Sequence, residues 1–402
     1  MLLPYQKRSL GLREVAMIIY NACIFTMTSD KPIKSGFIRI NSGKIAEISS
    51  GLPSDISGDD FNAAGMSVYP GFIDAHTHLG IIEDGLGFEG DDCNESSDPF
   101  TPQMRACDAI NPFDKCFAEA RNRGITAAAS SPGSSNPCGG QISVIKTNGR
   151  RVDDMLVRNA GIKFALGENP KTVFNDRDES PVTRMATAAI IREGLFKAKR
   201  YSQQLDDYNC DPDNFDPPDF DIKSESLIPL LQHKVKAFFH CHRADDICTA
   251  LRIAKEFSLD CVIIHGTEGY LIADILADEN VPVICGPILC DRCKPEMKGL
   301  DIKNPAELSR CDVKIAICTD HTVIPIQYLP LSALTAQKGG LPHLRALKAI
   351  TCDAADILGV SDFIGSLAVG MDADLQIYPS DCNPLDLLSE PAFVMIDGSF
   401  IS

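Results

Sequence analysis

The sequence PGFIDAHTHLG, residues 70–80, places two histidines directly after a run rich in apolar and β-branched residues. We expect residues 68–75 to form a buried strand, with His76 and His78 at its carboxyl end. Residues i and i+2 of a strand project to the same face, so the two imidazoles would converge on one point. Convergent imidazoles are what a divalent metal ion requires, and this stretch therefore predicts a metal site.

From this stretch to about residue 319, short β-rich runs alternate with longer helical ones. That alternation predicts parallel strands joined by crossover helices. We predict eight strands, at residues 68–75, 124–129, 141–146, 161–166, 235–240, 260–265, 281–285 and 313–319. Helices are predicted between most of them, at residues 112–123, 184–204, 245–257, 269–279 and 304–310. Eight such units closing on themselves form an α/β (β/α)8 TIM barrel, whose active site lies at the carboxyl ends of the strands.

The two ends of the chain have a different pattern from the barrel region. Short strand-like runs separated by turn residues occupy the first 65 residues or so and return after residue 364. We therefore predict that residues 1–67 and 363–402 share one small β domain outside a barrel of residues 68–362.

Composition limits the classes of partner. The chain has 38 Lys and Arg against 55 Asp and Glu, a net charge of −17, which argues against binding nucleic acid. No segment reaches the roughly 18 apolar residues of a membrane span, so we expect no membrane partner. We predict a small-molecule substrate and leave a homo-oligomer open.

The sixteen cysteines and the first residues bear on the cellular compartment. Several cysteines stand singly in apolar runs, as reduced and buried thiols do, so we predict a cytoplasmic protein. A secretory signal is the competing reading, because Lys7, Arg8 and Arg13 precede the apolar run 15–27. Asn21 interrupts that run and no small-residue cleavage site follows it, which argues against a signal.

Three further polar residues end predicted barrel strands. His240 ends the run KAFF, His265 ends CVII, and Asp320 follows KIAICT. One such residue would be unremarkable, but with His76 and His78 they form a set at the ends of four strands, as expected for metal ligands. We expect zinc, with iron and manganese left open because His and Asp ligands accept all three.

Motifs over nearly the whole chain resemble the amidohydrolase superfamily of metal-dependent hydrolases. They are PGFIDAHTHLG, HCHRAD, IIHGTEG, ICTDH and IGSLAVGMDADL. The sequence is most similar to the imidazolonepropionase-related branch, near the prolidase-type dipeptidases. The resemblance implies a barrel with a composite β-sandwich built from both chain ends. It also places the metal ligands at His76, His78, His240, His265 and Asp320. Residues 1–16 have no counterpart, and Met17 is an alternative start.

Lys163 in the run GIKFALG raises the question of one metal ion or two. In two-metal members of the superfamily a lysine on the fourth strand is carboxylated and bridges both ions, and Lys163 is similar in position. The alternative is that Lys163 points outward into the helix layer. Glu168 is the rival bridging carboxylate. If neither bridges, we expect a single ion.

We predict hydrolysis of a carbon–nitrogen amide-type bond in a small cyclic amide, with water as the nucleophile. Asp320 would act as general base and then general acid, and His242 would assist. Arg243, His321 and Glu268 lie beside predicted ligands and are the candidate substrate-binding residues. Arg243 would pair with a substrate carboxylate, or alternatively with Asp245 or Asp246. The competing functions are a binuclear Xaa dipeptidase and a non-catalytic assembly protein.

Overall fold

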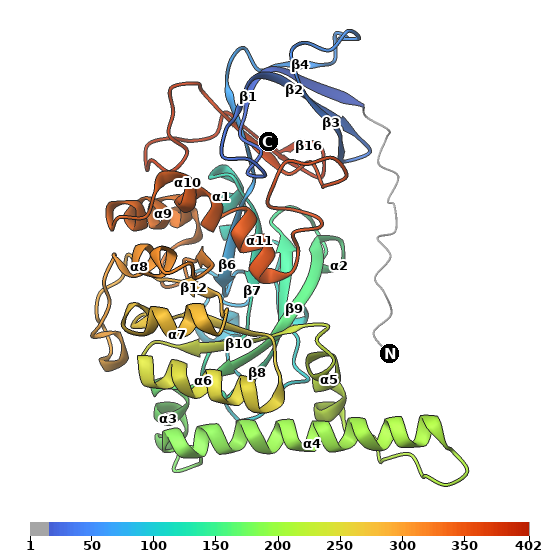
Figure 1. The fold of residues 1–402 in the computed structure, drawn as a ribbon, viewed down its shortest axis with the longest axis vertical. Coiled ribbons are helices and arrows are strands. Elements are labelled where there is room, and N and C mark those ends of the chain that lie inside the picture. Colours follow the sequence, from blue (N-terminus) through green and yellow to red (C-terminus); the bar gives the residue numbers. More distant parts are fainter. Residues whose placement is uncertain (1–15, 402) are drawn as a thin grey trace.

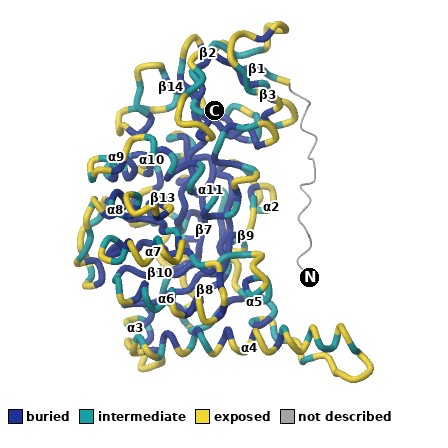
Figure 2. Tube along the Cα trace, viewed as in Figure 1, coloured by how far each residue is buried: buried dark blue, intermediate teal, exposed yellow. Residues whose placement is uncertain are grey.

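The computed structural model describes residues 16–401, which form a barrel sheet with a second sheet at one end (Figure 1). The strands of the barrel are buried, whereas the exposed residues lie mainly on the surrounding helices and loops (Figure 2). Strands buried on both faces have nearly continuous apolar sequences, which is why the barrel strands could be predicted from the sequence.

All eight predicted barrel strands are present. In chain order they are β6 Phe72–Thr77, β7 Ile125–Ser130, β8 Cys138–Lys146, β9 Leu156–Ala165, β10 Lys236–Cys241, β11 Cys261–His265, β12 Val283–Cys285 and β13 Ile315–Ile317. Each pairs with its neighbour in sequence. The carboxyl end of β6 meets the segment that follows β13, where Asp320 N donates to the His76 carbonyl (3.1 Å) and His78 N donates to the His321 carbonyl (2.7 Å). The sheet is therefore nearly closed.

Strand β8 departs from the uniform β/α pattern, because it runs antiparallel to both β7 and β9. Only the short loop 131–137 joins β7 to β8, and a parallel connection needs a crossover of a dozen or more residues. The amino end of β8 therefore lies near the carboxyl end of β9, where Cys138 pairs with Phe164. This reversal brings the loop 131–137 to the mouth of the barrel.

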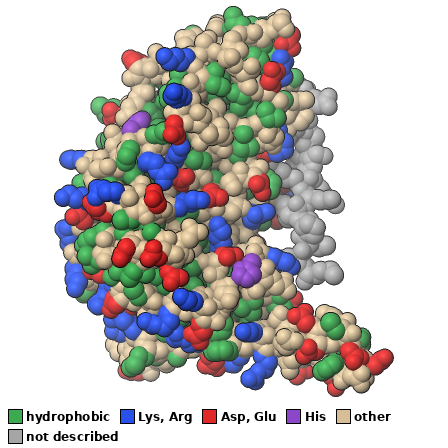
Figure 3. Space-filling view, viewed as in Figure 1, with side chains coloured by type: hydrophobic (Ala, Val, Ile, Leu, Met, Phe, Trp, Pro, Cys, Tyr) green, Lys and Arg blue, Asp and Glu red, His purple; other side chains and the backbone are tan. Residues whose placement is uncertain are grey.

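The helices surround the barrel, and all five predicted ones are present. The longer helices are α1 Cys116–Asn122, α3 Glu168–Asn175, α4 Arg184–Cys210, α5 Ile222–Leu231, α6 Ala244–Phe257, α7 Ala273–Asp278, α8 Asn304–Arg310, α9 Leu329–Lys338, α10 His343–Ala349 and α11 Cys352–Leu358. Helix α4 begins at a threonine cap, where Thr183 Oγ1 accepts from Ala186 N, and its far end projects from the body (Figure 1). Acidic side chains gather at that tip (Figure 3).

The second sheet contains strands from both chain ends. Its members are β1 Met17–Ile24, β2 Ile33–Asn41, β3 Lys44–Ser50, β4 Phe61–Asn62, β5 Ser67–Pro70, β14 Leu375–Tyr378, β15 Phe393–Ile396 and β16 Ser399–Ile401. Strand β5 pairs with both β1 and β14 and so joins the two chain ends in one sheet. The run predicted as one strand is divided at Gly71, where a Cβ would lie 2.0 Å from Thr126 Oγ1. Only glycine fits where the chain passes from one sheet to the other.

The state of the cysteines and the character of the helices bear on the expected cellular compartment. All sixteen cysteines lie in the described part of the chain, and none forms a disulfide there. Among residues 16–401 no helix combines the length and apolar character needed to cross a membrane. The candidate signal region falls partly outside the described residues, and its apolar run is largely strand β1.

A buried ion cluster holds the barrel to the C-terminal strands. Lys146 Nζ, at the end of β8, lies 2.8 Å from Asp372, 3.0 Å from Asp374 and 2.6 Å from Asp397. We expect Lys146→Met to lower the free energy of unfolding by about 3–5 kcal/mol, because it removes the buried cation that three carboxylates share. Denaturant unfolding would measure this. The matched change at exposed Lys255 should cost under about 1 kcal/mol, and equal effects of the two changes would contradict the assignment.

Candidate metal centre

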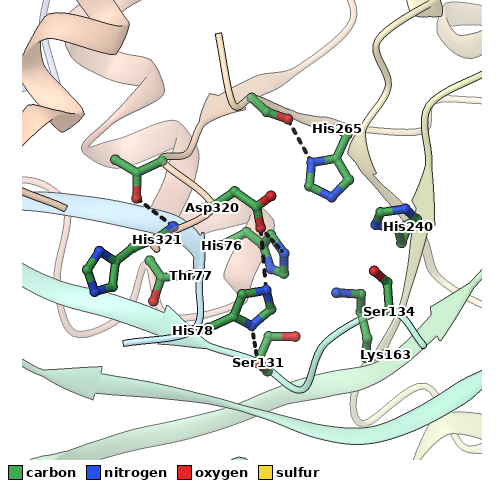
Figure 4. A network of polar contacts seen from close by, with 12 residues as sticks. His76, Thr77, His78, Ser131, Ser134, Lys163, His240, His265, Asp320 and His321 are labelled. Atoms are coloured by element: carbon green, nitrogen blue, oxygen red, sulfur yellow. Dashed lines mark hydrogen bonds and ion pairs between the residues drawn. The ribbon is translucent and has the colours of Figure 1, made fainter. Parts of the chain in front are cut away.

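Five imidazoles and one carboxylate gather at the carboxyl ends of the barrel strands. Figure 4 shows His76, His78, His240, His265 and Asp320 among them. They form two groups in which the potential ligand atoms lie within 4.8 Å of one another. The first group is His76, His78 and Asp320. The second group is His240, His242 and His265. We call these the first and second clusters.

The first cluster has the spacing of a metal site. His76 Nε2 lies 3.3 Å and His78 Nε2 lies 3.5 Å from Asp320 Oδ1, which is long for a hydrogen bond between such groups. Ligand atoms about 2.1 Å from a tetrahedral metal are about 3.4 Å apart, close to these separations. His76 Nε2 is buried and has no hydrogen-bond partner among the described residues. The residues of this cluster therefore fit a divalent ion.

Backbone carbonyl acceptors fix the orientation of two rings. His78 Nδ1 lies 2.7 Å from the Ser131 carbonyl, and His265 Nδ1 lies 2.7 Å from the Gly286 carbonyl. Each carbonyl can only accept, so in both rings Nε2 is left to face the clusters. In the second cluster, His240 Nδ1 is buried and has no hydrogen-bond partner in the described chain. The Nε2 atoms of His78 and His265 are therefore available to an ion.

Two residues that bear candidate ligands have unusual backbone conformations. The φ angles of His265 and Asp320 are 73° and 55°, in the left-handed region that non-glycine residues rarely adopt. Such conformations cost about 1–3 kcal/mol each and concentrate at functional sites. Here they turn the chain out of β11 and β13 directly after the apolar run, which lets the polar side chains enter the mouth.

Burial sets the protonation of most candidate ligands. It lowers the pKa of His76 and His240 well below the ordinary value and lowers that of His265 to about 3, so these rings are neutral. Burial raises the pKa of Asp320, but His265 and the first-cluster histidines outweigh it and keep that carboxyl ionised. Burial also lowers the pKa of His78, but Cys93 and Asp320 outweigh it and raise the value to about 10. A bound cation must displace that proton.

Lys163 lies inside the mouth of the barrel and not in the helix layer (Figure 4). Its Nζ lies 3.3 Å from the Pro132 carbonyl, in the loop that the reversed β8 brings to the site. Burial lowers its pKa to about 8, which makes the neutral amine accessible near neutral pH. Glu168, the rival bridge, begins α3, and its Oε2 accepts a hydrogen bond from Glu296 N (3.2 Å).

Of the other predicted site residues, one joins a cluster and two make contacts elsewhere. His242 joins the second cluster, and its Nδ1 lies 2.7 Å from Thr267 Oγ1. The Glu268 carboxylate accepts from Ala244 N at the start of α6 (3.1 Å). The ring of His321 points away from the clusters, and its Nδ1 accepts from Ile326 N (3.2 Å) (Figure 4).

The structure places Arg243 in an ion pair, and its binding of a substrate carboxylate stays a prediction. Its guanidinium makes a bidentate ion pair with Asp245, through contacts of 2.9 and 2.8 Å. The pairing follows from the local sequence, because a carboxylate two residues along lies within reach at the start of α6. The alternative reading, a surface ion pair, is the one observed.

Sequence reasoning missed Glu296, which lies in the 3-10 turn Pro295–Met297 after β12. Its side chain is only 1% exposed, and Oε1 lies 3.7 Å from the Nε2 atoms of both His240 and His242. Burial raises its pKa, but His242 and Lys294 outweigh burial and the pKa falls below the ordinary value. The sequence of this segment has no strand pattern and is typical of a polar surface loop, so it did not indicate a site residue.

Comparisons with known proteins identify the family and the fold. Residues 232–401 match the Amidohydrolase family. The crystal structure of an amidohydrolase from Thermotoga maritima MSB8 superposes with a TM-score of 0.91 at 39% identity, covering 96% of this chain and 99% of that one. A prolidase complexed with N-methylphosphonate-L-proline superposes with a TM-score of 0.58 at 15% identity, covering 96% and 99% of the two chains, which shows a shared fold.

A curated relative is considerably longer than this chain. Amidohydrolase tasK of Hapsidospora irregularis is 27% identical over 426 residues. The alignment covers 95% of this chain but 43% of that protein, so the chain spans less than half of the relative's length.

Proposed function

Because this chain belongs to the amidohydrolase family, we propose that it is a metal-dependent hydrolase that cleaves a carbon–nitrogen amide-type bond in a small cyclic amide. The observation that carries the proposal is the first cluster. There Asp320 Oδ1 lies 3.3 Å from His76 Nε2 and 3.5 Å from His78 Nε2, at the carboxyl ends of barrel strands. An ionised carboxylate beside two imidazoles is suited both to hold a cation and to accept a proton.

The two clusters would hold divalent ions. His76, His78 and Asp320 would hold a first divalent ion, and His240 and His265 would hold a second. Zinc suits these ligands, as do iron and manganese. When bound, such an ion lowers the pKa of water and polarises the substrate carbonyl.

The chain's own residues would move the proton. The Asp320 carboxylate accepts the proton of the attacking water and returns it to the leaving nitrogen. When His242 Nδ1 accepts from the Thr267 hydroxyl, its Nε2 carries hydrogen and can donate to the carbonyl oxygen of the substrate. Burial lowers the pKa of His242 to about 3, so this ring acts as a neutral donor.

A second candidate, a binuclear Xaa dipeptidase, is favoured by the inward position of Lys163. An ammonium beside two cations is repelled, so this lysine would have to be neutral or a carbamate, which carries a negative charge and two oxygens. Its burial and its pKa of about 8 support either form.

Replacement of Lys163 by alanine tests this second candidate. If the lysine bridges two ions, we expect the metal content to fall from two ions per chain to one or none, with partial rescue by short-chain carboxylic acids. Elemental analysis of the purified protein measures the count. The matched change at Lys197, which is exposed on α4, should leave the count unchanged. A single ion in both the parent and Lys163→Ala proteins would remove the dipeptidase candidate.

A substrate panel tests the proposed function itself. We expect turnover of one or more cyclic amides, loss of turnover with a chelator, and recovery with added zinc. Turnover restricted to dipeptides would select the second candidate. Absence of turnover in fully metal-loaded protein, across both classes, would instead favour the non-catalytic assembly role.

A further inference from the structure

Glu296 is a buried carboxylate that faces the second cluster, although the sequence did not indicate it as a site residue. Its Oε1 lies 3.7 Å from His240 Nε2 and 3.7 Å from His242 Nε2. Both distances exceed those of hydrogen bonds, and the distance to His240, a candidate ligand, approaches the separation of about 3.4 Å between two ligands of one tetrahedral ion. The other carboxylate oxygen is held by the backbone, because Glu168 N donates to Oε2 at 2.9 Å. Oε1 is thus directed at the imidazoles.

The second cluster needs a negative group more than the first does. The first cluster contains the Asp320 carboxylate, whereas all three members of the second cluster are imidazoles. A dication among neutral rings in a buried site is stabilised by an adjacent carboxylate. Glu296, only 1% exposed, supplies that charge at the edge of the cluster.

Lys294 provides a cation at the same oxygen. Its Nζ lies 2.9 Å from Glu296 Oε1 and donates to Asn169 Oδ1 at 3.1 Å. Asn169 in turn donates to Ser134 Oγ (2.6 Å) and lies 3.5 Å from His240 Nε2. Lys294 is 28% exposed, so the ammonium can swing into solvent. The loop 131–137, the first turn of α3 and the segment before Pro295 therefore meet over the second cluster and hold an internal ammonium against Glu296.

We propose that Glu296 is a carboxylate ligand of a cation in the second cluster, and that Lys294 is an internal counter-cation which competes with that ion for Glu296. This inference rests on the proposed function, because it requires the second cluster to bind metal. An ammonium and a dication at one oxygen repel each other, so filling the second cluster releases Lys294. Occupancy of the second cluster is then set by the balance between the two residues, independently of the first cluster.

Replacing Glu296 and replacing Lys294 should change the zinc affinity of the second cluster in opposite directions. Glu296→Gln removes the charge while keeping the shape, and we expect it to weaken zinc binding to the second cluster by about 10-fold or more. Lys294→Met removes the competitor, and we expect it to strengthen the same binding by severalfold. The matched control is Glu279→Gln, at the exposed end of α7, which should change nothing.

The experiment is calorimetric titration of zinc into metal-free full-length protein. A second set of titrations in a His76→Ala background disables the first cluster, so the remaining event reports the second alone. Circular dichroism of each metal-free variant checks that it is folded, and Lys294→Met keeps the test valid if Glu296→Gln is unstable. Weaker binding in Glu296→Gln with tighter binding in Lys294→Met supports the proposal.

Other outcomes overturn it. Unchanged zinc affinity in both variants, or weakening in both, would show that Lys294 and Glu296 do not oppose each other at the ion. Binding of one ion in the parent and none in the His76→Ala background would also overturn it, while leaving a mononuclear hydrolase intact. Absence of any bound ion in the parent would instead refute the proposed function.

Discussion

Replacing Asp320 with asparagine is expected to lower kcat by about 10²–10⁴-fold while leaving most of the bound metal in place. The amide keeps an oxygen that can face a cation, but it cannot accept the proton of the attacking water. The effect on kcat should be large because Asp320 is the carboxylate that lies beside both imidazoles of the first cluster. Parallel measurement of kcat and metal content of the same preparation tests this prediction.

The control for this change is Asp278→Asn, at the exposed end of α7, which should alter neither quantity. A proportional loss of activity and metal in Asp320→Asn would show that Asp320 only holds the ion. In that case the proton would have to be accepted by another group.

The second large effect is expected from His76→Ala and from His265→Ala, which should each abolish metal-dependent hydrolysis. Each change removes one candidate ligand, from the first and second cluster respectively, and leaves the apolar strand interior in place. Elemental analysis should show a lower metal content, and circular dichroism should show a folded barrel. His233→Ala and His343→Ala are matched controls, because these two histidines lie away from both clusters.

The outcome that would contradict this prediction is unchanged metal content and turnover in both cluster variants. Loss of activity in His76→Ala alone would restrict catalysis to the first cluster. It would also shift the proposed function toward a mononuclear enzyme.

The part of the fold that was predictable follows from burial. Barrel strands are buried on both faces, so each appears as a short apolar run, and a polar residue ending such a run stands out. This is why His240, His265 and Asp320 could be selected from the sequence before their positions were known. The structure brings all three to the same end of the barrel.

Other features depend on tertiary structure and were not readable. The reversal of β8 depends on the length of the loop 131–137, because the residues of a strand do not indicate whether it runs parallel or antiparallel to its neighbours. The position of Glu296 depends on how the segment after β12 folds over the mouth. The pairing of Arg243 was left as two alternatives, because its sequence neighbours offered a carboxylate as readily as a substrate would.

Anomalous diffraction from crystals of the protein as purified would test most directly the claim that this barrel mouth is a metal centre. The account predicts a transition-metal peak about 2.0–2.2 Å from His76 Nε2, His78 Nε2 and an Asp320 oxygen. A second peak would lie beside His240 and His265 if the site is binuclear. Absence of any peak at both clusters, in protein that hydrolyses amides in the presence of a chelator, would contradict the account.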